Sequence, residues 1–116
     1  MPVFGTILLN PSRTKVVLIK SFGYWGLPKG KVNKGETEFE CSLRETLEEV
    51  GFDATPLADP KLFIDSSTAK RNAKFYVVFD VPEKTPFQTN SHQEIQVKKK
   101  KKNLKIHSQI KIKKKN

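Results

Sequence analysis

The sequence predicts a mixed α/β domain in which β-strands flank a single amphipathic helix. Two observations predict this class. Apolar, β-branched runs of strand length alternate with turn residues along most of the first 97 residues. The segment between Thr37 and Gly51 repeats its apolar residues at helical spacing instead. Strands on both sides of a helix are typical of α/β domains, and 116 residues are enough for one modest core.

Six segments are expected to form or begin strands, because their apolar residues end at turn signals. Between the third of these segments and the helix, residues 28–36 combine Pro28, Gly30 and Gly35 with lysines, which predicts an ordered loop. The expected strands are residues 3–9, 15–19, 24–27, 61–65 and 73–81, and a last one beginning at 94–97.

The helix has both of its ends marked in the sequence. Thr37 and Glu40 have the spacing of a capping box, and Gly51 supplies a stop. At about 100° per residue, five residues share the face expected to pack on the core: Phe39, Leu43, Thr46, Leu47 and Val50.

Three glutamates, Glu45, Glu48 and Glu49, fall on the opposite face, in the last turns of the helix. Acids are unfavourable there, because the helix macrodipole is negative at its C-terminal end. A bound cation would offset this cost, and Mg²⁺ or Mn²⁺ prefers such oxygen ligands. The preceding loop carries cations that could neutralise a polyphosphate: Lys29, Lys31 and Lys34.

The segment "GKVNKGETEFECSLRETLEEVGF" resembles the signature of the Nudix hydrolases, G-x5-E-x7-R-E-U-x-E-E-x-G-U. Every fixed position is filled, from Gly30 and Glu36 to the Gly51-Phe52 end; Thr46 alone departs, where the family usually has an aliphatic residue. The resemblance implies an α/β/α sandwich with a mixed β-sheet and a loop–helix–loop catalytic motif. It also implies hydrolysis of a nucleoside diphosphate linked to another moiety.

The same resemblance implies roles for individual residues. Arg44 would orient the glutamates, and Glu36 would brace the loop and the start of the helix. The implied ligands of one or more Mg²⁺ or Mn²⁺ ions are the carboxylates of Glu45, Glu48 and Glu49, with the Gly30 carbonyl as a further ligand.

Segments on both sides of the signature resemble the catalytic domain of mRNA-decapping enzymes, over most of residues 2–96. They include "PVFGTILLN", "WGLPKGKVNKGE" and "AKFYVVFDVPEKTPFQTNSHQEIQ". The implied reaction is attack of a metal-activated water on a cap phosphate of capped RNA, giving 7-methyl-GDP and 5′-monophosphate RNA. Glu94 would act as a metal ligand or general base, and Lys29 and Lys31 would lie against the cap phosphates.

Decapping-type enzymes carry a helical regulatory domain before the Nudix domain, which recruits an activating subunit. That domain is expected to be missing here, because residue 3 already begins the first Nudix strand. A cytoplasmic location follows from the resemblance and from the absence of a recognisable signal segment. No run approaches the roughly 18–20 apolar residues of a membrane-spanning helix, so no membrane association is expected.

Two alternative functions remain open. "WGLPKGKVNKGE" and "LRETLEEVG" also resemble diadenosine tetraphosphate hydrolases, so the substrate could be a dinucleoside polyphosphate or a diphosphoinositol polyphosphate. The chain could instead be a weakly active Nudix module that binds RNA, although such a module gains nothing from intact glutamates.

The charge divides the chain into two parts. Residues 1–97 hold 12 basic and 12 acidic residues and are predicted to be the Nudix domain. Residues 98–116 hold the other 10 lysines and no acid, and are predicted to be a low-complexity tail that either contacts RNA phosphates or is simply solvated. The family's usual C-terminal basic helix is not evident there.

Four other side chains are ambiguous. Tyr24 and Trp25 could stack on a base, but core packing is the favoured interpretation. Arg71 could touch substrate, although a solvated loop is the default expectation. Cys41, the single cysteine, is placed on the acidic side of the helix and predicted to be inert; with two isolated histidines it makes no zinc site.

Overall fold

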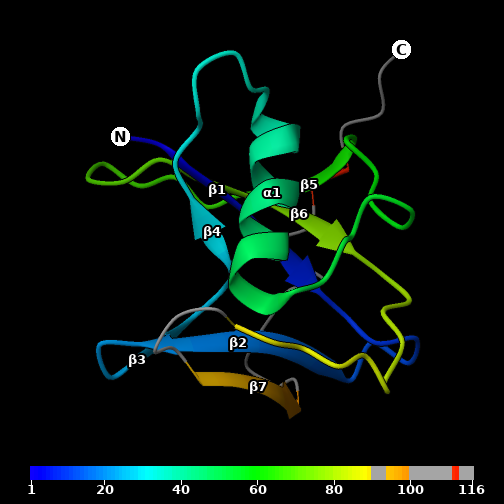
Figure 1. Ribbon diagram of the computed structural model, residues 1–116. Helices are drawn as coiled ribbons and strands as arrows, with labels where there is room; N and C mark the ends of the chain where they lie inside the picture. Colours follow the sequence, from blue (N-terminus) through cyan, green and yellow to red (C-terminus); the bar gives the residue numbers. More distant parts are fainter. Residues whose placement is uncertain (90–93, 100–110, 113–116) are drawn as a thin grey trace.

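We describe the protein from a computed structural model, which covers residues 1–89, 94–99 and 111–112. Five strands form a mixed sheet in the order β4–β1–β6–β5–β8 (Figure 1). The central pair, β1 and β6, is parallel, and its neighbours are antiparallel. The bounds of these strands are Val3–Leu8 for β1, Lys29–Gly30 for β4, Leu62–Asp65 for β5, Ala73–Val78 for β6 and Lys111–Ile112 for β8.

A second, antiparallel sheet has the order β3–β2–β7. Its strands are β2 (Lys15–Ser21), β3 (Tyr24–Gly26) and β7 (Glu94–Lys99). One isolated bridge, between Leu9 and Val16, continues the pairing from the first sheet into β2. The two sheets therefore share the N-terminal β1–β2 segment as their connection.

All six expected strands are present, and two short ones were not expected. β4 lies inside the predicted loop 28–36, where Gly30 pairs with Phe4. β8 lies within the range predicted to be a tail, and β7 continues two residues past the boundary expected at residue 97. The rest of the Lys-rich range, 100–110 and 113–116, lies outside the described residues.

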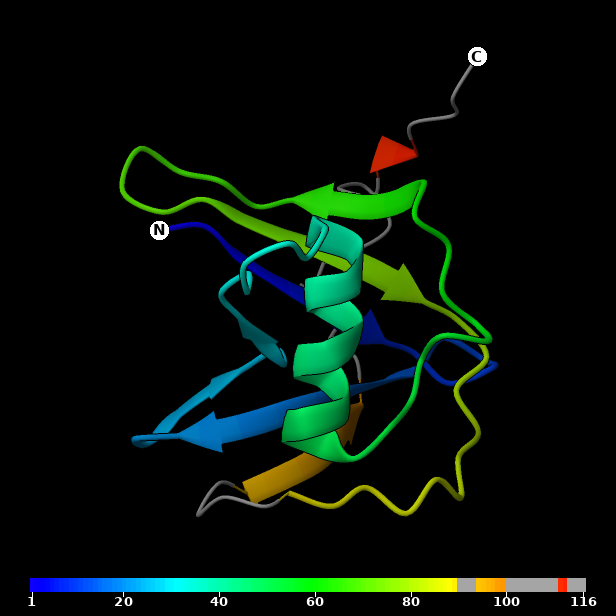
Figure 2. The same cartoon turned by 45° about the horizontal axis from the view of Figure 1, so that its top comes forward.

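The single helix found in the described part of the chain, α1 (Glu38–Val50), lies across the mixed sheet with its C-terminal end near β2 (Figure 2). Its predicted caps are confirmed. The Glu40 N–H donates to the Thr37 hydroxyl at 3.1 Å, and the Thr37 N–H donates to the Glu40 carboxylate at 3.0 Å. Gly51 ends the helix with a φ of 72°, in the left-handed region. As far as the described residues go, the helix is too short and too polar to cross a bilayer.

The buried face of α1 differs from the predicted one. Leu47 is half exposed, and the fully buried positions are Cys41, Ser42, Thr46 and Val50. Small and hydroxyl-bearing side chains face β1, so the helix can lie close to the sheet. Cys41 is fully buried, and it lies on the acidic side of the helix as expected, because its sulfur is 3.8 Å from Nη2 of Arg44.

Apolar residues fill both faces of the mixed sheet. Successive residues of β1 point to opposite sides, so Leu8 joins Val50 and Val78 under the helix. Ile7 and Phe75 join a second cluster on the far face. The acidic motif is thus carried on a helix that is anchored to the central strands of the sheet.

The departure of Thr46 from the family pattern has a structural partner. Its hydroxyl donates to the Ser42 carbonyl at 2.7 Å and lies 2.6 Å from the hydroxyl of Thr6, which is also fully buried on β1. Because the Thr46 proton points to Ser42, Thr6 is the donor between the two hydroxyls. A polar contact therefore joins α1 to β1 where an aliphatic contact would be usual.

Thr46→Val should destabilise the fold by about 1–3 kcal/mol, because it leaves the buried Thr6 hydroxyl without its acceptor. Adding Thr6→Val should recover most of that loss, because two apolar groups of similar shape leave no polar group unsatisfied. Urea unfolding of the two single variants and the double variant measures the coupling. Losses that simply add in the double variant would contradict the proposed pairing.

Candidate active site

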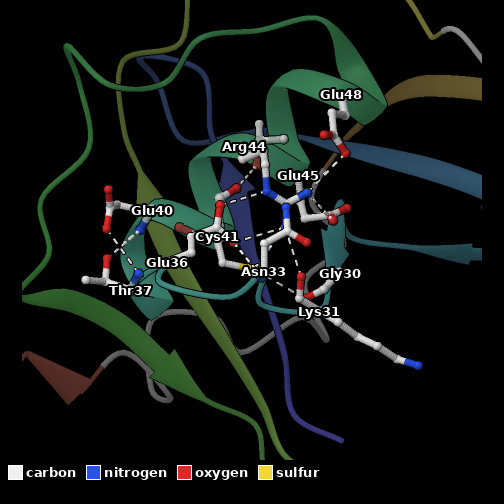
Figure 3. Close-up of polar contacts among 12 residues, drawn as sticks. Gly30, Lys31, Asn33, Glu36, Thr37, Glu40, Cys41, Arg44, Glu45 and Glu48 are labelled. Atoms are coloured by element: carbon white, nitrogen blue, oxygen red, sulfur yellow. Dashed lines mark hydrogen bonds and ion pairs between the residues drawn. The ribbon is translucent and has the colours of Figure 1, made fainter.

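Arg44 is the centre of the polar network at the helix (Figure 3). Its Nε and Nη2 donate to the two carboxylate oxygens of Glu36, at 2.7 and 3.0 Å. Its Nη1 donates to Glu45 at 2.8 Å and to Glu48 at 3.2 Å. Nη2 also donates to the Lys31 carbonyl at 2.9 Å. The Arg44 guanidinium thus connects Lys31 and Glu36, in the loop before the helix, with two glutamates of the helix itself.

Glu36 ties the loop before α1 to the helix. Besides its two bonds from Arg44, its carboxylate accepts the Asn33 N–H at 3.0 Å. Hydrogen bonds from the Arg44 side chain, followed by the one from Asn33, lower the pKa of Glu36 to about 2. The carboxylate therefore stays charged, and its oxygens are used within the protein rather than toward the solvent.

Gly30 provides space for the first motif glutamate. The carboxyl group of Glu45 lies so close to the Gly30 backbone that a Cβ on Gly30 would overlap it. The Gly30 carbonyl accepts the Cys41 thiol at a sulfur–oxygen distance of 3.6 Å. Burial raises the pKa of that thiol to about 11, so it is neutral, in agreement with the inert role expected of Cys41.

Glu49 lies in a different environment from the other two glutamates. It is half-buried and accepts the Lys29 backbone N–H at 3.0 Å. Burial raises the pKa of Glu49 to about 7; the charges of Glu45 and Glu48 act in the same direction, and the bond from Lys29 opposes them. Arg44 does not reach this carboxylate, so among the motif glutamates Glu49 is the one whose charge is least compensated.

The donor set fits a hard divalent cation by its chemistry. One oxygen each of Glu45, Glu48 and Glu49 is held by Arg44 or Lys29, and the second oxygen makes no hydrogen bond within the described part of the chain. Such oxygens suit Mg²⁺ or Mn²⁺. In residues 1–89 and 94–99, however, no three acidic, thiol or imidazole groups are already gathered at one point. The fit therefore rests on donor type and on their common helix, not on a preformed cage.

A groove of about 480 Å³ opens beside Glu49. Its walls include Tyr24 and Trp25 from β3, Lys29 from β4 and Arg71 from the β5–β6 loop. Tyr24 is 80% exposed, so the favoured prediction that it packs in the core was wrong. Arg71 was expected by default to lie in a solvated loop, with contact to substrate as the alternative. The sequence could not predict this groove, because residues 24–29 and residue 71 come close together only in the tertiary fold.

The remaining predicted site residues are spread more widely. Lys31 is exposed; its carbonyl is held by Arg44, and its ammonium group extends away from the glutamates (Figure 3). Lys29 is half-buried, and its ammonium group donates to the Leu27 carbonyl at 3.2 Å. Glu94, exposed, begins β7 opposite Lys20 of the second sheet, so it approaches from another element than the helix glutamates.

The Glu36–Arg44 pair should give stability a defined dependence on pH. The folded-state pKa of Glu36 is about 2, below its ordinary value of 4.5, so the pair stabilises fully above the ordinary value. This contribution is lost as the pH falls from about 4.5 to about 2. The stability difference between wild type and Glu36→Gln, measured by urea unfolding, should shrink across this window. A difference that stays constant would contradict the assignment.

A family model described as "NUDIX domain" matches residues 1–102. The mRNA decapping complex subunit 2 of Schizosaccharomyces pombe is 36% identical over 98 residues, which span 82% of this chain and 13% of that protein. The mRNA-decapping enzyme subunit 2 of Arabidopsis thaliana is 33% identical over 97 residues, 82% of this chain and 26% of that protein. The m7GpppN-mRNA hydrolase of Saccharomyces cerevisiae is 32% identical over 97 residues and is matched over 10% of its length. The chain thus spans between a tenth and a quarter of these relatives.

Solved structures show the same fold at lower sequence identity. A Caenorhabditis elegans Ap4A hydrolase binary complex superposes with a TM-score of 0.67 at 18% identity, covering 84% of this chain and 79% of that one. A MutT/nudix family protein from Enterococcus faecalis superposes with a TM-score of 0.64 at 24% identity, covering 84% and 43%. The mixed sheet, the capped helix and the matched sequence signature lead to one conclusion: the chain belongs to the Nudix domain family.

Proposed function

We propose that this chain is a metal-dependent Nudix pyrophosphohydrolase that cleaves the 5′ cap of mRNA into 7-methyl-GDP and 5′-monophosphate RNA. The observation that carries the proposal is the Arg44-ordered set of glutamates beside a groove that also presents Lys29 and Arg71. The relatives matched over 82% of this chain are named as decapping enzymes, which supports the cap as the substrate.

The reaction consumes one water molecule. A bond forms between the water oxygen and a phosphorus of the triphosphate bridge, the bond from that phosphorus to the bridging oxygen breaks, and the departing phosphate leaves as an anion. One water proton must pass to a base. The protein has to hold the phosphates, neutralise their charge and accept that proton.

Mg²⁺ or Mn²⁺ would be held by the carboxylates of Glu45, Glu48 and Glu49, with the Gly30 carbonyl as a further ligand; the Gly30 backbone lies against the Glu45 carboxyl. When bound, such a cation supplies charge stabilisation for phosphate oxygens and lowers the pKa of a bound water. Arg44 is a positioning residue here, because its donors fix one oxygen of Glu45 and one of Glu48 while Glu36 fixes the guanidinium.

Lys29 and Lys31 are proposed to contact the cap phosphates. Lys29 is the better placed of the two, since it lines the groove and its backbone N–H orients Glu49.

The candidates for the general base are Glu94 and Glu49. Glu49 is half-buried at the groove, whereas Glu94 is exposed at the start of β7. We also infer capped RNA as the binding partner, an activating subunit as an associate, and a cytoplasmic location.

A second candidate is hydrolysis of a small substrate, either a dinucleoside polyphosphate or a diphosphoinositol polyphosphate. The charge distribution favours it, because residues 1–97 carry equal numbers of basic and acidic residues and so lack the net positive charge of an RNA-binding domain. A weakly active RNA-binding module is the third candidate. The ordered carboxylates argue against it, since a binding module has no need to orient three acids by hydrogen bonds from Arg44 and Lys29.

A product assay distinguishes these functions. The chain is incubated with Mn²⁺ or Mg²⁺ and, in parallel, with cap-labelled RNA and with diadenosine tetraphosphate. We expect release of 7-methyl-GDP from the RNA and little cleavage of the dinucleotide. Cleavage of diadenosine tetraphosphate alone would replace the proposal with the small-substrate function. Binding of RNA without any turnover would favour the binding module.

Glu49→Gln should lower turnover on the cleaved substrate by at least about 100-fold, because the site loses a charged oxygen ligand while the Lys29 N–H keeps an acceptor. The matched control is Glu38→Gln, at the other end of α1, which loses only an exposed pair with Lys74. That control should keep near wild-type turnover, since exposed pairs contribute little. Turnover of Glu49→Gln within threefold of wild type would contradict the metal assignment.

A further inference from the structure

The tip of the β2–β3 hairpin exposes aromatic side chains in an unfavourable backbone conformation. Ser21 pairs with Tyr24, so Phe22 and Gly23 form a two-residue turn, and both have positive φ, 50° and 82°. This conformation favours Asn-Gly, and a bulky residue is disfavoured there. Phe22 is nevertheless 98% exposed and Tyr24 80% exposed. Neither burial nor backbone preference explains why aromatic residues occupy this tip.

The hairpin leads directly into the groove beside Glu49. Tyr24 and Trp25 line the groove on the β3 side. The β5–β6 loop, which carries Arg71, projects from the same side of the molecule as the hairpin (Figures 1 and 2). The groove therefore has the exposed Tyr24 and the half-buried Trp25 at one wall and a cationic residue at another.

Two cations share this groove. Lys29 and Arg71 both line it. Within the described residues, neither Lys29 nor Arg71 forms an ion pair with a carboxylate at a nitrogen–oxygen distance of 4.0 Å or less. Glu49 is the one carboxylate among the described residues that line the groove, so two positive charges face one negative charge, and a further anion would be favourable there. Phosphate is such an anion, and arginine binds it well through its fork of donors.

We propose that the groove is a nucleotide subsite, in which a base stacks on Tyr24, with Phe22 at the adjoining hairpin tip extending the aromatic surface, and the neighbouring phosphates contact Arg71 and Lys29. The bond to be cleaved then lies toward Glu49, which lines the same groove. A volume of about 480 Å³ suits one nucleotide. The inference deepens the proposed hydrolase function and rests on it for the identity of the ligand.

Trp25 is the only tryptophan and lines the groove, so its fluorescence reports on binding. The full chain is titrated in EDTA, without turnover, with GDP, 7-methyl-GDP and ADP, and separately with inorganic pyrophosphate. We expect saturable quenching by the nucleotides. Tyr24→Ala should weaken nucleotide binding about fivefold or more while leaving pyrophosphate binding unchanged, because it removes only stacking. Arg71→Ala should weaken binding of both kinds of probe about tenfold.

Matched variants serve as controls. Tyr24→Phe keeps the ring and should bind as wild type does, and Arg71→Lys should fall between wild type and Arg71→Ala. Lys61→Ala removes an exposed charge outside the groove and should change nothing. Phe22→Asn should raise the urea midpoint, because Asn tolerates the positive φ, and yet weaken nucleotide binding. A purely structural Phe22 would not show those two opposite effects.

The outcomes separate this inference from the proposed function. Quenching by none of the nucleotides at millimolar concentrations, or Tyr24→Ala and Arg71→Ala variants that bind like Lys61→Ala, would overturn the subsite even if capped RNA is hydrolysed. If the binding pattern holds but neither capped RNA nor diadenosine tetraphosphate is cleaved, the subsite stands and the hydrolase proposal falls.

Discussion

The site depends on one guanidinium group. Arg44 holds both oxygens of Glu36, one oxygen of Glu45 and one of Glu48, and it also binds the Lys31 carbonyl. Without it, carboxylates on adjacent turns would repel one another, and the Lys31 carbonyl and the Glu36 carboxylate would lose their hydrogen bonds to the helix. Arginine is suited to this task because its five donors lie in one plane and its charge is permanent. Lysine could make only part of the network.

Arg44 can act in this way only because the helix is fixed on the sheet beneath it. The Thr6–Thr46 hydroxyl pair and the small buried residues of α1 bring the helix close to β1. β4 also pairs with β1, and this pairing places the Gly30 backbone against the Glu45 carboxyl of α1. The parallel β1–β6 pair therefore positions both parts of the motif, the loop and the helix.

The local parts of this structure could be predicted from the sequence, and the tertiary parts could not. The caps at Thr37 and Gly51 depend on neighbouring residues, and the helix bounds were correct. The buried face of the helix was predicted wrongly at Leu47, which is half exposed. Which helix residues are buried depends on contacts that are distant in sequence, such as that of Thr46 with the Thr6 hydroxyl 40 residues away. β4 is two residues long and has no pattern of its own. The groove was missed for the same reason, since Tyr24 and Arg71 meet only in the fold.

The acidic end of α1 remains only partly compensated within the protein. Arg44 reaches Glu45 and Glu48 but not Glu49, and the helix ends at Gly51 with no basic residue in its last turn. The negative macrodipole and two neighbouring carboxylates therefore act on Glu49, whose pKa is raised to about 7 chiefly by burial. A hydrophobic residue at this position would avoid that cost. The Glu49 carboxylate lies where the groove meets the helix. A divalent cation bound there together with a phosphate ligand would compensate the negative charge of Glu49 and that of the phosphate.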